Sequence, residues 1–516
     1  MGAIRLDGNT LSTTEVSLVS KGAKVEVASN AWNNVDAARK VVENILSSGE
    51  TVYGINTGFG ALVSEIIPED DLAALQVNLV RSHACGIGEP MSIEDTRAMM
   101  CVRVNSLVKG HSGVKREIIE QIVTYLNEDI VPVVPRIGSL GASGDLAPLS
   151  HMALALIGEG EVWVDEVPTK TSNVLKEKGL IGVELTAKDG LSLINGTSQM
   201  CSFLANADIM LSNLLPIADL ISCVSLEARE CSIKPMDERV HEVRPHAGQS
   251  MVAKRITEIM KGSAILEAHA NCDKVQDAYS FRCIPQVHGA VLESYLKLSS
   301  TVAIEINSAT DNPLIFPNPA NPGPDEVVSQ GNFHGEILAL CADHMSHAIF
   351  ELASISERRI DQMVDPSRSK LPAFLAKNSG LESGMMIVHY VAAAALAEMR
   401  GRANPRSAFS TPTSAGQEDH VSMGATACWN LLQSCNHLSQ VLACELIIAC
   451  EALEYRVAKP AEYVNALYKL VRKISKPLTG DRSTSTEIED VAACLRNGGW
   501  LSRIEAEHGR LPRLVR

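Results

Sequence analysis

Aromatic side chains are scarce in this 516-residue chain, where they make up 4% of the residues while hydrophobic residues make up 46%. The core must therefore be built mainly from Ala, Leu, Ile, Val and Met, a composition that favours closely packed helices. The length alone allows several average domains or one large enzyme unit.

Positive charge is also in short supply. The chain has 46 Lys and Arg against 61 Asp and Glu, which gives a formal net charge of −15, and it contains no long basic stripe. Because binding to nucleic-acid phosphates needs clustered Lys and Arg, we expect no nucleic-acid partner.

The sequence has no CxxC pair, and its 13 cysteines follow no regular spacing. This pattern favours free thiols in a reducing cytosol over a disulfide framework. The first residues lack the apolar core of a signal peptide. The apolar segment at 441–453 carries Glu445 and Glu451, so it is too short and too charged to span a bilayer. We therefore expect a cytoplasmic protein with no membrane partner.

Helical patterns dominate most of the chain. Residues 1–110 are predicted to be mixed and loop-rich, and residues 111–516 to form a helical-bundle region. Apolar residues recur at three- and four-residue spacing in long stretches at 92–109, 116–127, 197–230, 279–306, 332–361 and 421–455. Shorter patterns predict a β-like run at 24–27, a helix at 34–46, and loops at 312–331 and 401–416. Long helices with broad apolar faces often need more than one chain to cover them.

The most informative motif is Ala142-Ser143-Gly144, at the centre of Gly-Ser-Leu-Gly-Ala-Ser-Gly-Asp-Leu-Ala-Pro-Leu-Ser at 138–150. Glycine permits cramped, left-handed backbone, so Gly141 and Gly144 could bring the Gly144 nitrogen towards the Ala142 carbonyl. If that ring closes and Ser143 loses its hydroxyl as water, the product is a conjugated methylene group, which is a strong electrophile. A surface turn is the simpler interpretation of such residues. A hydrolase nucleophile elbow is disfavoured, because it requires Gly-x-Ser-x-Gly.

Four other segments carry candidate chemistry, and each also has a plain structural interpretation. Tyr53 begins a glycine-rich segment at 53–60 that matches neither Walker A nor GxGxxG, so a surface loop is an alternative. His83 lies beside a glycine turn, where a histidine is often only a hydrogen bonder. Arg282 could hold a carboxylate with its planar fork or form a surface ion pair. Glu418 lies in a charged run that could simply face solvent.

Gln276, Tyr279 and Arg282 are spaced at i, i+3 and i+6. On a continuous helix the outer pair lies about 600° apart, so the three side chains would not share one narrow face. A helix start or break near Tyr279 would let them converge.

Two histidine pairs, at 241–246 and 344–347, could suggest a metal site. Neither forms HExxH or lies in a cysteine-rich setting, and Pro245 interrupts the first. We expect no catalytic metal and no pyridoxal phosphate.

Residues 138–150 resemble the signature of the aromatic amino acid ammonia-lyase and aminomutase family, and the resemblance extends from Tyr53 to about Met423. Members of that family build 4-methylidene-imidazol-5-one (MIO) from Ala-Ser-Gly. The resemblance implies a mainly α fold, with an aspartase/fumarase-like long-helix bundle and a smaller mixed, loop-rich N-terminal part. It also implies a homotetramer whose active sites combine residues from three chains.

The same resemblance assigns roles to individual residues. Tyr53, in a mobile lid, becomes the candidate base for the substrate β-proton, a role that needs its pKa lowered from about 10. The Ser82-His83 pair resembles that of members acting on histidine, and Glu418 stands where members acting on tyrosine or phenylalanine carry a neutral amide. Arg282 would hold the substrate carboxylate. The remaining residues that match pocket positions are Asn195, Gln276, Tyr279 and Phe333.

The expected reaction is non-oxidative removal of ammonia from the amino acid L-histidine to give trans-urocanate, the first step of histidine degradation, with MIO from Ala142-Ser143-Gly144 as the electrophile. The alternatives are a tyrosine or phenylalanine ammonia-lyase or aminomutase on the same scaffold, and a non-catalytic helical scaffold. Two departures from the family pattern bear on pocket shape or subunit packing: Gly416 replaces an asparagine and His389 replaces a glutamine.

Overall fold

The computed structural model describes residues 2–58, 66–270, 275–318 and 323–514. The chain divides into two compact units made of interleaved segments. The first unit contains Met1–Asn206, Ser299–Asp343 and Pro405–Trp429, and the second contains Ala207–Leu298, His344–Asn404 and Asn430–Arg516. The predicted boundary after residue 110, between a mixed N-terminal region and a helical-bundle region, lies inside the first unit.

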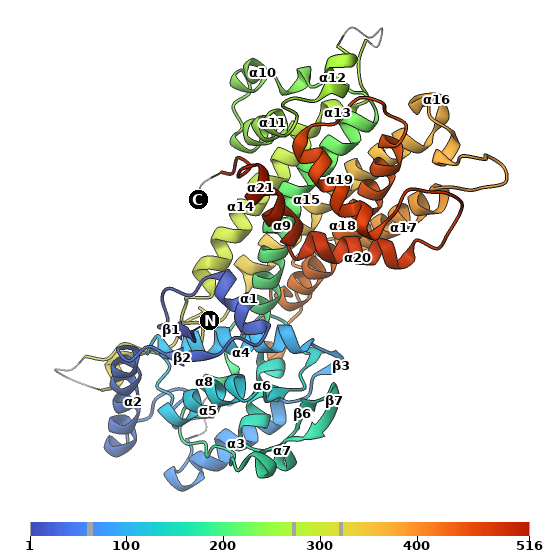
Figure 1. The fold of residues 1–516 in the computed structure, drawn as a ribbon. Helices are drawn as coiled ribbons and strands as arrows, with labels where there is room; N and C mark the ends of the chain where they lie inside the picture. The colour runs from blue at the N-terminus through green and yellow to red at the C-terminus, as the bar shows by residue number, and fades with distance from the viewer. Residues whose placement is uncertain (1, 59–65, 271–274, 319–322, 515–516) are drawn as a thin grey trace. The chain divides into compact units, whose positions relative to one another are not determined.

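The first unit combines helices with short strands (Figure 1). In chain order its elements are β1 (Ile4–Leu6), α1 (Thr13–Ser20), β2 (Val25–Val27), α2 (Ala31–Ser48), η2 (Glu69–Asp71), α3 (Leu72–His83), β3 (Ile87–Pro90), α4 (Ile93–Val108), α5 (Arg116–Asn127), β4 (Val131–Pro132), β5 (Pro135–Ile137), α6 (Leu146–Leu156), β6 (Glu161–Val164), β7 (Val167–Lys170), α7 (Thr171–Lys178), α8 (Asp189–Ile194), β8 (Leu314–Ile315), η4 (Pro324–Glu326), β9 (Val327–Val328) and η6 (Ser414–Gly416).

The strands make small sheets rather than one central sheet. β1 pairs in parallel with β2, in register Ile4 to Val25, and β4, β6 and β7 form an antiparallel sheet of three strands. β3 pairs with β5, and β8 with β9. The β-like run predicted at 24–27 is β2, and the helix predicted at 34–46 is α2.

The second unit is helical. Its own elements are η3 (Lys234–Met236), α10 (Glu238–Glu242), α11 (Ala247–Ile259), α12 (Ala264–Ala268), α13 (Tyr279–Arg282), α16 (Pro366–Ser369), η5 (Ala373–Leu375), α17 (Met386–Arg402), α19 (Glu462–Ile474), α20 (Ser485–Arg496) and α21 (Gly499–His508). Four longer helices have residues in both units: α9 (Ser198–Ala228), α14 (Ile284–Glu305), α15 (Glu336–Val364) and α18 (Gly424–Leu453). The prediction of a mainly α chain with long helices is confirmed.

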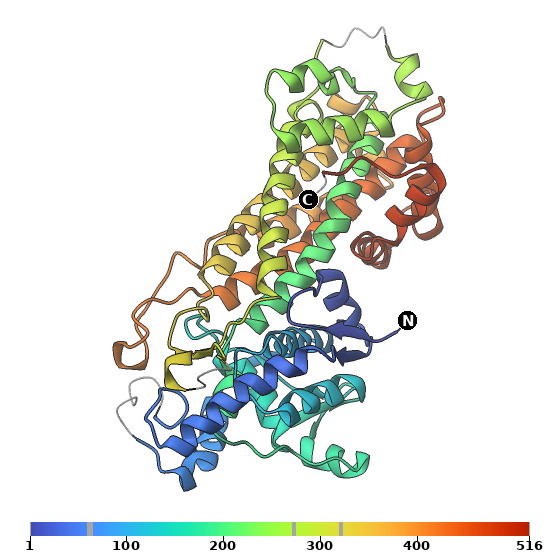
Figure 2. The ribbon, with the colours of Figure 1, turned by 90° about the vertical axis from the view of Figure 1, so that its left-hand side faces the viewer.

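Within the second unit, α9, α14, α15 and α18 lie side by side (Figure 2). Buried charges link them. His288 of α14 lies 2.6 Å from the Asp219 carboxylate of α9, and Arg359 of α15 pairs at 2.5 Å with Glu445 of α18. Burial lowers the pKa of His288. Since burying a lone charge is costly, Glu445 compensates Arg359, while Arg255 of α11 pairs with the Asp219 carboxylate that also contacts His288.

Local signals determine where individual helices begin and end. Ser92 caps α4, because its hydroxyl accepts a hydrogen bond from the Asp95 backbone N at 3.0 Å. The predicted helix at 279–306 is divided, since α13 ends before Cys283 and α14 begins at Ile284. Every cysteine in the described residues is a free thiol.

Among the described residues, one helix is long and apolar enough to cross a membrane by length and composition. This helix is α9, and 78% of its most apolar 18-residue segment is buried inside the protein. Core helices of soluble proteins can have the same length and composition, so α9 gives little support to a membrane span.

Candidate active site

A cavity of about 1160 Å³ in the first unit brings together most of the residues singled out in the sequence. Those that line it are Tyr53, His83, Ala142, Ser143, Asn195, Phe333 and Glu418. The lining also includes polar residues that the sequence analysis missed, namely Asn78, Asn312, Gln330, His334, Gln417, Asp419 and His420. Several of these residues are adjacent in sequence to predicted site residues, and the sequence offered no other signal for them.

The backbone at the triad has the cramped geometry expected of it. Gly141 and Gly144 have φ of +67° and +72°, in the left-handed region that favours glycine. Gly144 pairs with Gly196 in an isolated β-bridge, and the Asp145 N donates to the Gly196 carbonyl at 2.7 Å. A Cβ atom on Gly144 would lie 2.2 Å from that carbonyl oxygen. The loop therefore has room for glycine alone at this position.

Both the hydroxyl and the carbonyl of Ser143 form hydrogen bonds. Its hydroxyl donates to Oε1 of Glu418 at 3.1 Å, and its carbonyl accepts from Nδ2 of Asn195 at 2.7 Å. Oδ1 of Asn195 is buried and has no hydrogen-bond partner among the described residues. Ser143 would supply the carbonyl of an MIO ring, so Asn195 is already placed to donate to that oxygen. The residues present fit the group.

Substituting Gly144 by alanine tests the close approach of the two backbones. Left-handed backbone costs a non-glycine residue about 1–2 kcal/mol, and the overlap with the Gly196 carbonyl should add a further ~1–3 kcal/mol. Gly179 is the matched control, because it has φ of +66° and no atom within 4 Å of where a Cβ would lie. Urea unfolding should show a clearly larger loss of unfolding free energy for Gly144→Ala than for Gly179→Ala. Equal losses would contradict a steric clash at Gly144.

Asp145 anchors the triad loop to the start of α9. Its Oδ2 accepts from the backbone N of Gln199 at 2.8 Å and of Met200 at 3.1 Å, while Oδ1 accepts from the Ser139 hydroxyl at 2.8 Å. Burial raises the pKa of Asp145 to about 6, although these hydrogen bonds act in the opposite direction. The sequence analysis did not single out Asp145.

The raised pKa of Asp145 predicts a pH dependence of stability. Between pH about 4 and about 6 the folded chain binds more protons at this group than the unfolded chain, so the unfolding free energy falls as pH rises through that window. The full effect is roughly 3 kcal/mol, from about two pKa units at 1.36 kcal/mol each. Asp145→Asn cannot titrate. Urea unfolding from pH 4 to 7 should therefore show the wild-type stability falling relative to the variant, and a constant difference would contradict the raised pKa.

His83 lies at the end of α3 with one ring nitrogen turned towards its own helix. Nδ1 lies 2.9 Å from the Leu79 carbonyl, which can only accept, so Nδ1 carries the proton in that contact. Nε2 then remains an acceptor in the neutral ring. This tautomer suits a residue that receives a hydrogen bond from a bound group.

Tyr53 follows α2 in a turn that is tied down by Asn56. The Asn56 side chain accepts from the Val52 N and donates to the Glu50 carbonyl, both at 2.8 Å. Gly54 has φ of +76°, and a Cβ there would lie 2.7 Å from Cδ of Pro313. Of the predicted lid at 53–60, residues 59 and 60 lie outside the described residues.

Gln276, Tyr279 and Arg282 lie close together, as a helix start near Tyr279 would allow. α13 begins at Tyr279, and the Arg282 guanidinium donates to Oε1 of Gln276 and lies 5.4 Å from the centre of the Tyr279 ring. All three belong to the second unit, and none is among the residues that line the triad cavity. Gln276 and Arg282 line a separate cavity of about 620 Å³ in that unit.

Among the described residues, His334, Glu336 and His420 form a group whose ligand atoms lie within 4.8 Å of one another. The two imidazole rings stack at 5.7 Å, and Nε2 of His334 lies 3.2 Å from the His420 carbonyl. Of the histidines considered from sequence, His241 contacts Gln249 and the Pro235 carbonyl, and His344 contacts the Ser294 hydroxyl. The absence of a catalytic metal stays a prediction.

The two departures from the family pattern lie in different places. Gly416 has φ of +87° and lies between Ser414 and Gln417, which both line the cavity. His389 lies on α17 in the second unit, where its Nε2 is 2.7 Å from Oε1 of the buried Glu357 of α15. Gly416 therefore bears on the pocket, and His389 on helix packing.

The chain matches known proteins along most of its length. A family model described as aromatic amino acid lyase matches residues 11–473. A histidine ammonia-lyase of Myxococcus xanthus is 43% identical over 505 residues, covering 98% of each chain. The human histidine ammonia-lyase is also 43% identical, over 94% of this chain and 74% of its own length.

Solved structures share the fold over nearly the whole chain. Histidine ammonia-lyase from Trypanosoma cruzi has a TM-score of 0.90 at 38% identity, covering 98% of this chain and 95% of its own. Tyrosine aminomutase from Streptomyces globisporus has a TM-score of 0.92 at 34% identity, covering 98% and 99%.

Proposed function

The chain belongs to the aromatic amino acid lyase family, and we propose that it removes ammonia from L-histidine to give trans-urocanate, at the start of histidine degradation. The observation that carries the reaction type is the Ser143 site, whose hydroxyl meets Glu418 and whose carbonyl meets Asn195. The substrate assignment rests on Glu418 and His83, which line the same cavity.

An electrophile is needed because the amine of an amino acid leaves poorly. MIO, formed from Ala142-Ser143-Gly144, supplies that electrophile. Asn195 holds the Ser143 carbonyl and stabilises negative charge on that oxygen, which is the role of a preorganised donor in a buried site.

Glu418 is the residue that we assign to the substrate imidazole. Its Oε2 is held at 2.5 Å by the Thr413 hydroxyl, so the carboxylate is oriented from behind. Its Oε1 accepts from the Ser143 hydroxyl. Once that hydroxyl leaves as water, Oε1 is released to accept from an imidazole N–H. A charge-assisted hydrogen bond of this kind is worth about 1.5–3 kcal/mol.

His83 and Tyr53 complete the part of the site in the first unit. His83, with Nδ1 donating to Leu79, offers Nε2 as an acceptor to the substrate. Tyr53 removes the β-proton, and this role requires that its pKa be lowered when substrate is bound. Phe333 contributes an aromatic wall.

The direct test is an assay panel of L-histidine, L-tyrosine and L-phenylalanine. Purified enzyme with histidine should accumulate free ammonia and an ultraviolet absorber with the spectrum of urocanate. Turnover of tyrosine without turnover of histidine would overturn the substrate assignment. A β-amino acid product in place of ammonia would identify an aminomutase, and no product with an unmodified protein mass would identify a non-catalytic scaffold.

We also propose a homotetramer in which Gln276, Tyr279 and Arg282 act in the site of another copy, with Arg282 binding the substrate carboxylate. The support is that these residues converge on one another but do not line the cavity that holds the triad. Tyr279 is 74% exposed in the single chain.

Mixed oligomers test this sharing. Ser143→Ala and Arg282→Met should each be inactive when expressed alone. Co-expressed, they should regain activity, because some sites then combine an intact triad from one chain with an intact Arg282 from another. If Arg282 acts within its own chain, no mixed site is complete and activity stays absent.

We place the enzyme in the cytoplasm, without pyridoxal phosphate or a catalytic metal. The thiol state of the described cysteines supports a reducing compartment. Dialysis against a chelator should leave histidine turnover unchanged.

A further inference from the structure

Asn195 directly follows α8, a helix of six residues from Asp189 to Ile194, and its side chain bonds to the triad residue Ser143. So short a helix has little stability of its own, because helix nucleation is costly and few hydrogen bonds follow it. Whatever holds α8 in place therefore determines where Asn195 points.

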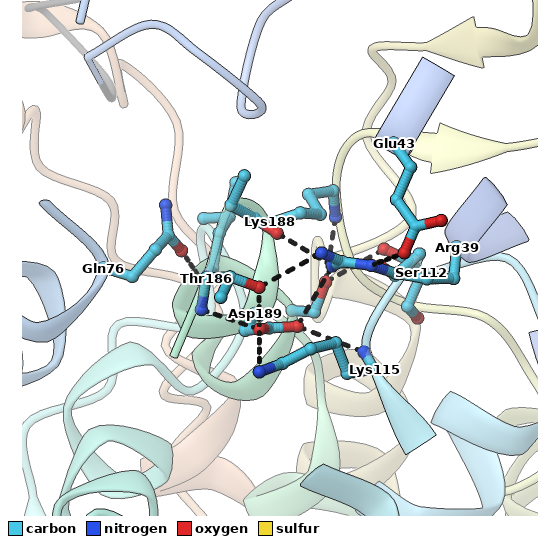
Figure 3. Close-up of polar contacts among 12 residues, drawn as sticks. Arg39, Glu43, Gln76, Ser112, Lys115, Thr186, Lys188 and Asp189 are labelled. Carbon is cyan, nitrogen blue, oxygen red and sulfur yellow. Dashed lines mark hydrogen bonds and ion pairs between the residues drawn. The ribbon is translucent and has the colours of Figure 1, made fainter. Parts of the chain in front are cut away.

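The start of α8 is held by a buried carboxylate (Figure 3). Oδ2 of Asp189 accepts from the N and the hydroxyl of Thr186, both at 2.8 Å, and Oδ1 accepts from the Lys115 N at 3.1 Å. The Arg39 guanidinium lies 3.4 Å from Oδ1. In the same view, Oε1 of Gln76 accepts from the Leu191 N at 3.1 Å.

A second buried pair supports the same turn. Nζ of Lys188 lies 3.1 Å from Oδ2 of Asp311, and both side chains are fully buried. Lys188 also donates to the Ser192 hydroxyl at 3.1 Å, and that hydroxyl donates to the Ser112 carbonyl at 3.0 Å. The Ser112 hydroxyl donates to Oδ1 of Asp311 at 3.1 Å, which closes the network.

The end of α8 is held by Arg103, a fully buried residue of α4. Its guanidinium donates to the Ser192 carbonyl and, at 2.8 Å, to the Asn195 carbonyl. Burial lowers the pKa of Arg103 to about 10, and the negative charges of Asp311 and Asp145 act against this shift, so the group remains a cation at neutral pH. Negative charge at the start of a helix, here Asp189, and positive charge at its end, here Arg103, both interact favourably with the helix dipole.

Arg103 lies directly behind the two residues that touch the triad loop. It binds the carbonyl of Asn195, whose side chain reaches the Ser143 carbonyl. A Cβ on Gly196 would lie 2.4 Å from Nη1 of Arg103, and the Gly196 carbonyl accepts from the Asp145 N. The Arg103 guanidinium thus lies against the 195–196 segment, and its hydrogen bond there is to Asn195.

We propose that Arg103 is a positioning residue for maturation of the triad, acting through Asn195. The proposal rests on the MIO chemistry proposed above. In that chemistry the Gly144 nitrogen bonds to the Ala142 carbonyl carbon, and a first water leaves with that carbonyl's oxygen and the amide hydrogens of Ser143 and Gly144. A second water then takes the Cα hydrogen and the hydroxyl of Ser143.

The second loss of water is the step that Asn195 assists. Removing the Cα hydrogen of Ser143 places negative charge on the adjacent carbonyl oxygen, and Nδ2 of Asn195 donates to that oxygen at 2.7 Å. A displacement of Asn195 by about 1 Å can cost a factor of ~100 in rate. Loosening the end of α8 is therefore expected to slow the second loss of water.

The test compares two arginines on α4. Arg103→Met removes the proposed support. Arg97→Met is the matched control, because Arg97 is 2% exposed and also binds a backbone carbonyl, that of Val19 at 2.9 Å, with Asp129 as its ion-pair partner. The intact mass of each freshly synthesised protein is followed over time, together with circular dichroism and thermal unfolding.

Wild type and Arg97→Met should both lose two waters at similar rates, even where Arg97→Met is less stable. Arg103→Met should lose the second water about 10 to 100 times more slowly. If folded Arg103→Met matures as fast as Arg97→Met, the proposal is wrong. A wild type that loses no water would instead overturn the MIO chemistry, so the two failures are distinguishable.

Arg103→Lys provides the measurement if Arg103→Met does not fold. Lysine keeps the charge but lacks the planar fork that spans two carbonyls. It should slow maturation in the wild-type background and have no further effect in an Asn195→Ala background, since Arg103 acts through Asn195. If Arg103→Lys matures at the wild-type rate, or if it slows maturation equally in both backgrounds, the proposal is wrong.

Discussion

Ser143→Ala is expected to abolish maturation of the triad and with it most lyase activity. Alanine has no hydroxyl to lose, so the intact mass should show at most one missing water where wild type lacks two. Turnover of histidine should fall by more than about a thousandfold, which corresponds to only ~4 kcal/mol of transition-state stabilisation. Intact-mass measurement and the urocanate assay on the same sample check both effects.

Ser150→Ala is the control for this substitution. Ser150 belongs to the same thirteen-residue motif, but its hydroxyl donates to the Leu146 carbonyl of its own helix at 2.7 Å. It should lose both waters and turn over histidine as wild type does. Full activity of Ser143→Ala would refute the electrophile, whatever the mass showed.

The helices of this fold could be predicted because their signals are local. Apolar residues at three- and four-residue spacing located α5 at its observed ends and the long helices to within a few residues. A helix start or break near Tyr279 was the condition for Gln276, Tyr279 and Arg282 to converge, and α13 begins at Tyr279. Local spacing could not reveal which segments form each compact unit, because those units combine residues far apart in the chain.

The site was only partly predictable for the same reason. The residue types of Ala142-Ser143-Gly144 allowed a cyclised electrophile, and the family resemblance of residues 138–150 favoured it over a surface turn. The left-handed φ of Gly144 is compatible with that ring. The contact of Ser143 with Glu418 joins residues 275 positions apart. Arg103 gave no sequence signal, since a charged residue within a helical pattern is ordinarily placed on the solvent side, and its two carbonyl partners lie about 90 residues away.

Buried charge explains why such residues escape prediction from local patterns. Lys188, Asp311 and Arg103 are fully buried, and each is tolerated only because the folded chain supplies partners for it. Residues of this kind are recognisable once their partners are known. In this chain they surround the short helix that precedes Asn195, a helix with little stability of its own.

Glu418→Gln is expected to change which substrate the enzyme prefers. Glutamine fills the same space but offers a neutral oxygen, so the hydrogen bond to the imidazole N–H loses its charge assistance. A neutral hydrogen bond is worth about 0.5–1.5 kcal/mol against about 1.5–3 for a charge-assisted one, so a loss of ~1–1.5 kcal/mol should lower kcat/KM for histidine roughly 5- to 13-fold. Steady-state kinetics on matured protein, with maturation verified by intact mass, measure this change.

The same substitution should not lower kcat/KM for phenylalanine. A phenyl ring has no hydrogen-bond donor to replace an imidazole N–H, so it leaves the Glu418 carboxylate desolvated and unpaired in the wild-type site. Glutamine removes that cost. The ratio of kcat/KM for histidine to that for phenylalanine should therefore fall by at least as much as the histidine value itself.

Asp419→Asn separates this contact from the general negative charge of the cavity. Asp419 is exposed and lines the same cavity one residue further along, but its exposed side chain gains little from a charge–charge interaction screened by water. Its substitution should change kcat/KM for histidine by less than about threefold. Equal losses for Asp419→Asn and Glu418→Gln would mean that long-range charge selects the substrate, and the assignment of the imidazole to Glu418 would then fail.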